Sequence, residues 1–146
     1  MFELTVAGAC APALVDDCWS NLSQYRWRLD KHGYVMRKTM GKRIYLHHVV
    51  LPGTRYPSFV RDHVNRDKLD NRLSNLRWLA LAQSNQNKGP QARNIVGIRG
   101  VTLVGGRYRA AARLGGKLHS LGYFDTAALA QFAVEQWRST HMPYAA

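Results

Sequence analysis

The sequence of 146 residues predicts an α+β chain: a β-rich N-terminal part, then a strand–loop–strand–helix block, then a three-stranded antiparallel sheet with one helix. Three observations support this class. Short runs alternate apolar and basic residues, two Gly-Gly pairs separate such runs near the end, and the last segment has apolar residues at helical spacing. We expect two domains, residues 1–90 and 91–146, joined by a linker at residues 91–96.

The N-terminal part is predicted to form short strands at residues 13–15, 25–29, 34–37 and 44–51. Turn-forming pairs of aspartate, glycine or lysine separate them. The aromatic residues Tyr25, Trp27 and Trp78 are expected in the core, because large aromatic side chains bury the most apolar area.

The middle block begins with a strand at Phe59-Val60 that leads into Asp62-His63. The polar residues 65–72 predict a long loop, and residues 76–79 a returning strand. Helix-forming residues continue to Lys88, where Gly89-Pro90 ends a helix predicted over 79–88.

The C-terminal part is predicted to form strands over residues 97–103, 107–114 and 117–123. Gly105-Gly106 and Gly115-Gly116 each fit a two-residue hairpin loop. Asp125-Thr126 is a predicted helix N-cap. One helix face is expected to pack against the even residues of the middle strand; this face consists of Leu129, Phe132, Ala133 and Trp137.

The charge of the chain points to a polyanionic partner. Lys and Arg number 21 against 9 Asp and Glu, which gives a formal charge of +12. Residues 31–61 and 86–124 contain no acid and seven bases each. Nucleic acid is therefore the first expectation; an anionic membrane surface is the second, and no long basic amphipathic helix favours it.

The location is expected to be the cytoplasm of a bacterial host. Two cysteines cannot form a disulfide scaffold or a four-cysteine zinc site, which favours a reducing compartment. No apolar run approaches the roughly 18 residues of a membrane helix.

Asp62-His63 and the later carboxamides Asn85 and Asn87 are residue types that nuclease chemistry can use. A neutral histidine takes a proton from water near neutral pH. Carboxylate and carboxamide oxygens are hard ligands that suit Mg²⁺, which stabilises a developing oxyanion. An Asp-His pair alone is common, so the surrounding residues decide the interpretation.

Those residues closely resemble the HNH endonucleases of phages and mobile introns. The resemblance covers roughly residues 10 to 90, and four segments carry it: Asp62-His63-Val64-Asn65, Asp70-Asn71-Arg72, Asn75-Leu76-Arg77-Trp78 and Gln83-Ser84-Asn85-Gln86-Asn87-Lys88. It implies a ββα-metal fold and metal-dependent hydrolysis of phosphodiester bonds in double-stranded DNA.

The resemblance also implies roles. His63 matches the general base, Asp62 a metal ligand, and Asn75 the residue that pins the loop and so orients the histidine. Asn85 matches the second ligand, although Ser84 or Asn87 could fill that position. The expected ion is Mg²⁺, with Mn²⁺ possible.

Two positions depart from the family pattern. Arg66 stands where glycine is usual, which suggests a different turn or an added phosphate contact. His48 stands where arginine is usual after His47. The loop residues Asp67, Asp70 and Asn71 are expected to hold the loop by side-chain to backbone bonds rather than to bind metal. Whether His47 lies near the active site is left open, with both histidines expected on a strand.

Residues 94–140 resemble the Apetala-two/ethylene-response-factor DNA-binding domain. Gly97-Ile98-Arg99-Gly100-Val101 and Leu121-Gly122-Tyr123-Phe124-Asp125-Thr126 carry the resemblance, with Tyr108 in place of the usual tryptophan. It implies a sheet face laid into the major groove, where arginine reads guanine or binds phosphate. A solvated charged face is the alternative.

The predicted DNA-contacting residues lie in both domains: Arg43, His47, Arg61, Arg66, Arg72, Arg77, Lys88, Arg99, Arg107, Arg109, Arg113 and Lys117. An inactive DNA-binding regulator and an RNA-binding accessory protein remain alternative functions. The target site, nicking versus double-strand cleavage, and monomer versus homodimer stay open.

Overall fold

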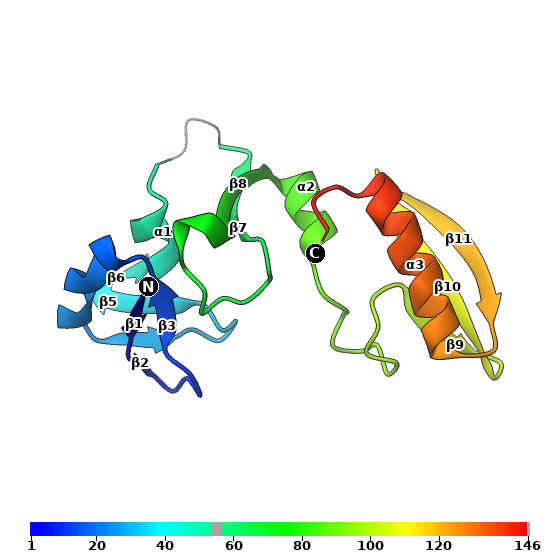
Figure 1. Cartoon of the computed structure of the whole chain (residues 1–146), viewed down its shortest axis with the longest axis horizontal. Coiled ribbons are helices and arrows are strands. Elements are labelled where there is room, and N and C mark those ends of the chain that lie inside the picture. Colours follow the sequence, from blue (N-terminus) through cyan, green and yellow to red (C-terminus); the bar gives the residue numbers. More distant parts are fainter. Residues whose placement is uncertain (54–56, 146) are drawn as a thin grey trace. The chain divides into compact units, whose positions relative to one another are not determined.

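The computed structural model describes residues 1–53 and 57–145. The chain is α+β, with several small sheets and few helices (Figure 1). It divides into two compact units, Met1–Leu81 and Ala82–Ala146. Within the residues described, no helix is both long enough and apolar enough to cross a membrane.

The N-terminal unit contains two small sheets before its hairpin. In one, β1 (Phe2–Leu4) pairs antiparallel with β3 (Ala13–Val15). The other has the order β2 (Val6–Ala7), β4 (Trp27–Leu29), β5 (Val35–Thr39) and β6 (Lys42–Tyr45). The predicted strand at 13–15 is confirmed, whereas the one at 25–29 begins only at Trp27, after the 3₁₀ segment η1 (Asp17–Gln24).

Trp27 is a central core residue of this unit. Its side chain is only 2% exposed, and its indole N–H donates to the carbonyl of Leu22 at 2.9 Å, so its polar atom is satisfied. Tyr25 was expected in the core and is exposed; the Arg37 guanidinium lies 3.9 Å from the centre of its ring. Its ring therefore covers a charged side chain instead of filling the interior.

The strand predicted over 44–51 is wrong beyond Tyr45. Helix α1 (Leu46–Val50) begins there, after the last β5–β6 pair, Met36 with Tyr45. Leu46 and Val50, four residues apart, are both buried, so the apolar spacing of this segment is helical despite its β-branched valines. His47 and His48 therefore lie on a helix rather than on alternating faces of a strand.

The middle block forms an antiparallel hairpin of β7 (Phe59–His63) and β8 (Leu76–Ala80). The helix predicted over 79–88 is shorter than expected. Ala80 still pairs with Phe59, so α2 covers only Leu81–Ser84 and is followed by the 3₁₀ turn η3 (Asn85–Asn87). Strand pairing of Leu79 and Ala80 prevails over their helix propensity.

The C-terminal unit contains the predicted three-stranded antiparallel sheet, in the order β11 (Lys117–Phe124), β10 (Arg107–Leu114) and β9 (Val101–Val104). Both predicted hairpin loops are confirmed: all four of their glycines have positive φ, as two-residue hairpin turns of this kind require. β9 begins later than predicted, at Val101, because Gly97 and Gly100 also have positive φ and form turns before it.

Helix α3 (Ala127–His141) lies across one face of this sheet (Figure 1). The predicted cap is confirmed, since Thr126 Oγ1 accepts a hydrogen bond from the backbone N–H of Leu129 at 3.2 Å. The predicted buried face is wrong in part: Ala130 and Val134 are buried and Ala133 packs against them, whereas Leu129 and Phe132 are exposed.

Small residues explain which face of α3 packs inward. Ala110 and Ala112 of β10 are buried as predicted, and they leave room for the helix to approach closely. A Cβ atom on Gly100 would lie 2.6 Å from the carbonyl oxygen of Ala111 and 3.1 Å from a methyl group of Val134. This close packing suits Ala130 and Val134 better than the larger Leu129 and Phe132.

Candidate active site

Asp62 and His63 are the last two residues of β7. Asp62 lies opposite Arg77 in the strand register, and His63 lies opposite Leu76. Both side chains are buried, with exposed fractions of 9% and 5%. A buried carboxylate or imidazole needs hydrogen-bond partners, so the contacts of this pair define what the site can do.

The carboxylate of Asp62 forms an ion pair with Arg77. The Nε and an Nη atom of the guanidinium both lie 3.0 Å from Asp62 Oδ2. Oxygen atoms of a carboxylate are hard donors of the kind that Mg²⁺ prefers. A carboxylate has two acceptor oxygens, and this ion pair is made at Oδ2.

His63 contacts Asn71 through Nε2, which lies 3.3 Å from Asn71 Oδ1. The orientation of this amide is set by its nitrogen, which donates to the carbonyls of Lys68 and Leu69. The oxygen can only accept, so His63 Nε2 carries the proton, and a neutral ring then has its lone pair on Nδ1. Sequence reasoning expected Asn71 only to hold the loop and missed this contact with the histidine.

Asn75 connects the two sides of the loop that follows His63. Its Oδ1 accepts from the backbone N–H of Asn65 at 3.0 Å, and its Nδ2 donates to the carbonyl of Asp70 at 2.8 Å. Its own carbonyl accepts from the N–H of Val64 at 2.9 Å. These bonds restrain the backbone next to His63, which is the kind of restraint the predicted role of Asn75 requires.

The acidic residues of the loop serve its structure, as predicted. Asp67 Oδ1 accepts from the N–H of Leu69 at 2.9 Å. Asp70 forms a bidentate pair with Arg72, at 2.8 and 2.6 Å, and this interaction lowers the pKa of Asp70. The loop is also tied to β3, since Asn71 N donates to the carbonyl of Leu14.

A group of aromatic and imidazole rings surrounds His63. The ring centre of His47 lies 5.4 Å from that of His63, and the ring of Tyr34 lies 5.2 Å from His47 and 6.1 Å from His63. His47 is therefore next to the predicted base. Its Nδ1 atom is buried and has no hydrogen-bond partner among the residues described.

Burial keeps both imidazoles neutral. It lowers the pKa of His47 to about 3, and the charges of His48, His63 and Arg61 act in the same direction. Burial also lowers the pKa of His63, although the Asn71 hydrogen bond and nearby carboxylates oppose this shift. A base that accepts a proton near pH 7 must be neutral beforehand, so the environment of His63 suits that role.

The metal site is only partly supported by the donor atoms. Within residues 1–53 and 57–145, no three or more His, Cys, Asp or Glu side chains form a group that could hold a metal ion. Asp62 supplies the hard oxygen donor that Mg²⁺ prefers. Asn85, the predicted second ligand, lies in η3 of the other compact unit, so a shared ion stays a prediction.

The predicted DNA-contacting residues of the N-terminal unit differ in their availability. Arg43 and Arg66 are exposed, and His47 is buried. The other three are engaged within the protein. Arg61 donates to the carbonyl of Leu51 at 2.6 Å and stacks on Trp78, Arg72 binds Asp70, and Arg77 binds Asp62.

In the C-terminal unit, Lys88, Arg107, Arg113 and Lys117 are exposed, and Arg109 is half-buried. Arg107 pairs with Asp125 at 3.0 Å. The guanidinium of Arg99 donates to the backbone carbonyls of Asn85, Gln86 and Lys88. It therefore holds that segment, in addition to any contact with DNA.

Arg66 adopts a backbone conformation that favours glycine. Its φ is +67°, in the left-handed region, where a non-glycine residue costs about 1 kcal/mol or more. The backbone takes the glycine-like turn although arginine occupies the position. The side chain is exposed, in a loop next to the Asp62-His63 pair.

The chain is similar to one curated relative, from Acanthamoeba polyphaga mimivirus, whose name describes it as an uncharacterized HNH endonuclease. The two are 30% identical over an alignment of 113 residues, and the alignment covers 75% of this chain. The chain spans 59% of the length of that relative. No family model matches the chain, and no solved structure matches it.

His47 is expected to make stability depend on pH. Its folded-state pKa of about 3 lies below the unfolded value of 6.5, so the unfolded chain binds the extra proton. The resulting loss in the free energy of unfolding is roughly 2 kcal/mol between about pH 7 and about pH 5. The substitution His47→Gln should remove this part of the pH dependence in urea unfolding. The exposed control His32→Gln should keep this pH dependence. If the free energy of unfolding of both variants changed equally with pH, the assignment to His47 would be contradicted.

Proposed function

We propose that this chain is a metal-dependent HNH endonuclease that hydrolyses phosphodiester bonds in double-stranded DNA, of the kind found in phages and mobile introns. The observation that carries the proposal is the environment of His63: buried, held by Asn71 through Nε2, and adjacent to the Asp62 carboxylate at the end of a hairpin strand. The similarity to the mimivirus relative supports the same family.

In this proposal His63 acts as the general base. Its Nδ1 atom takes a proton from the attacking water, while Asn71 keeps the ring in the tautomer that has the lone pair there. Asn75 keeps the loop backbone in place beside the ring. Burial favours the neutral ring before the reaction and so keeps the base ready.

We propose that Asp62 and Asn85 hold the divalent cation, Mg²⁺ or Mn²⁺, with waters and phosphate oxygens as the other ligands. When bound, such an ion stabilises the negative charge that develops on the leaving oxygen. Asp62 would then share its carboxylate between the ion and the guanidinium of Arg77.

The C-terminal unit is proposed to bind the DNA in the manner of an Apetala-two-like domain. The exposed bases on its sheet carry this part of the proposal, and Arg113 and Lys117 are among them. The buried residues Ala110 and Ala112 of β10 face α3, which leaves the opposite face of the sheet for a ligand.

One observation favours a second candidate, an inactive DNA-binding regulator on the same scaffold. The ion pair between Arg77 and Asp62 competes with a metal ion for the carboxylate. If the pair persists when DNA is bound, the chain would keep its DNA affinity without cleaving.

Cleavage of duplex DNA tests the proposal directly. The full chain should nick or cut plasmid or phage genomic DNA with Mg²⁺ and lose this activity with a chelator. His63→Ala should lower the cleavage rate by roughly 100-fold or more, because it removes the general base. A gel shift should show unchanged DNA binding by the same variant.

The matched control is His32→Ala, at an exposed histidine in the turn before β5. It should cleave as the wild type does. A fully active His63→Ala variant would remove His63 from the mechanism. Tight DNA binding without cleavage under any metal would support the regulator instead.

Arg66→Gly separates the backbone role of this residue from its charge. Glycine adopts the observed φ without strain, although it also makes the unfolded chain more flexible, so thermal stability should change by less than about 1 kcal/mol. If the guanidinium binds phosphate, DNA affinity should fall and the salt dependence should weaken by about one phosphate contact. Unchanged affinity and salt dependence would show that the side chain does not bind DNA.

A further inference from the structure

The hairpin of β5 and β6 in the N-terminal unit has an apolar residue at its tip (Figure 1). Thr39 pairs with Lys42, so Met40 and Gly41 form the two-residue loop between the strands. Met40 is 97% exposed, the largest exposed fraction among the large apolar residues described. Folding therefore buries almost none of its apolar surface, and the hydrophobic effect gives no reason for methionine at this position.

The backbone of Met40 is also strained. Its φ is +46°, in the left-handed region, where a side chain is unfavourable. The loops Gly105-Gly106 and Gly115-Gly116 have glycine at the equivalent first position, with φ of +56° in both, and glycine adopts this conformation freely. Met40 thus combines a strained backbone with an exposed apolar side chain, and neither favours folding. Such strain is typical of residues with a function.

Exposed bases flank the tip of this hairpin. Lys38 and Arg43 lie directly opposite each other in the strand register, and Lys42 follows the loop. Like charges that face each other across two strands are destabilising. Among the residues that the structure describes, no ion pair involves these three side chains, and residues 31–61 contain no acid. A polyanionic partner would relieve the repulsion between them.

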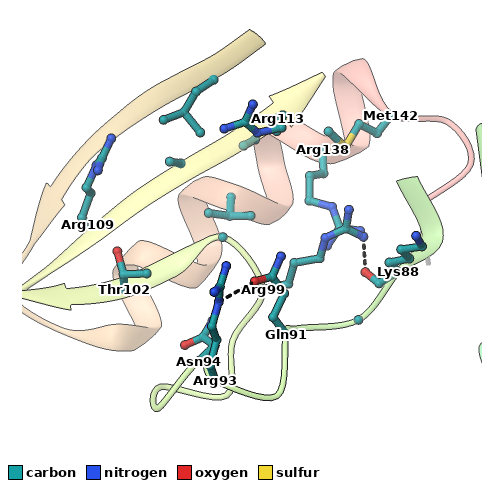
Figure 2. A pocket seen from close by; sticks show the side chains of 16 residues that line it. Lys88, Gln91, Arg93, Asn94, Arg99, Thr102, Arg109, Arg113, Arg138 and Met142 are labelled. Carbon is teal, nitrogen blue, oxygen red and sulfur yellow. Dashed lines mark hydrogen bonds between the residues drawn. The ribbon is translucent and has the colours of Figure 1, made fainter. Parts of the chain in front are cut away.

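The shape of the hairpin suits a groove of DNA. In the C-terminal unit, by comparison, bases such as Arg109 and Arg113 line a cavity of about 640 Å³ (Figure 2). A cavity receives a group that projects from a partner, whereas a two-stranded ribbon enters a groove of its partner. Bases along the ribbon then contact phosphates, and the residue at the tip reaches the stacked bases.

We propose that the β5–β6 hairpin enters the minor groove of DNA and that the Met40 side chain wedges between two base pairs and kinks the duplex. The inference rests on DNA as the partner in the proposed function, but not on cleavage. Methionine is flexible and polarizable, and it is among the apolar residues that proteins insert between base steps. Unstacking the bases costs free energy, which phosphate contacts of Lys38, Lys42 and Arg43 offset.

Binding to a duplex with a central mismatch tests the wedge in the full chain. A mismatch weakens stacking, so a wedge enters there at lower cost. With a chelator present, the wild type should bind the mismatched duplex roughly 10-fold more tightly than the matched one. Met40→Gly should bind the two duplexes equally, because it removes the wedge, while glycine keeps the turn without strain. Met40→Leu restores an apolar wedge and should keep the preference.

The matched control is Ile95→Ala, at an apolar residue that is 88% exposed and lies in a turn outside the hairpin. This variant should keep the preference for the mismatched duplex. Energy transfer between dyes at the two duplex ends measures the kink, and the ends should lie closer together with the wild type than with Met40→Gly. Equal binding of both duplexes by the wild type, an unchanged preference in Met40→Gly, or its loss in Met40→Leu would overturn the inference.

A second arm sediments the wild type and Met40→Gly with phosphatidylserine vesicles, because a basic hairpin with an apolar tip also suits an anionic membrane. Vesicle binding that Met40→Gly loses, together with equal binding of the two duplexes, would overturn the DNA assignment. Because the DNA assay contains a chelator, a chain that prefers the mismatched duplex through Met40 but never cleaves DNA would refute the endonuclease and leave the hairpin inference standing. Cleavage by a chain without this preference would refute the hairpin inference alone.

Discussion

The candidate active site depends on one constraint: the polar loop between β7 and β8 must supply hydrogen-bond partners for its own backbone. Asn65, Asp67, Asn71 and Asn75 each bond to backbone groups of the loop, and Asp70 is neutralised by Arg72. Unsatisfied buried polar groups would cost about 1–3 kcal/mol each. The same side chains that order the loop also position His63, because Asn71 bonds to both. Structure and proposed chemistry are thus linked through a single carboxamide.

The arginine side chains of the two compact units have different kinds of partner. In the N-terminal unit, Asp70 pairs with Arg72 and Asp62 pairs with Arg77, so both guanidinium groups are engaged within the protein. In the C-terminal unit, backbone carbonyls accept hydrogen bonds from the guanidinium groups of Arg99 and Arg138. Residues 86–124 contain no acid and seven bases, a composition that suits binding to a nucleic-acid backbone.

Much of the fold could be predicted from local sequence. The Gly-Gly hairpins, the Thr126 cap and the alternation in residues 107–114 all specify structure within a few residues, and all were confirmed. The sequence-based predictions failed where tertiary packing determines the bounds of an element or its buried face. Pairing with β7 extended β8 through Ala80, and close packing against Gly100 selected Ala130 and Val134 as the inner face of α3. The candidate site was predicted as residue types, whereas the Asn71–His63 bond depends on loop geometry that spacing does not reveal.

The most direct test of the account asks whether Asp62 and Asn85 hold one ion beside His63. Mn²⁺ is paramagnetic, so in nuclear magnetic resonance spectra it broadens the signals of residues near its site. The account predicts selective broadening of all three residues as Mn²⁺ is added, and its loss in Asp62→Asn. Broadening of Asp62 and His63 without Asn85, or of Asn85 alone, would contradict a single shared site and with it the proposed nuclease centre.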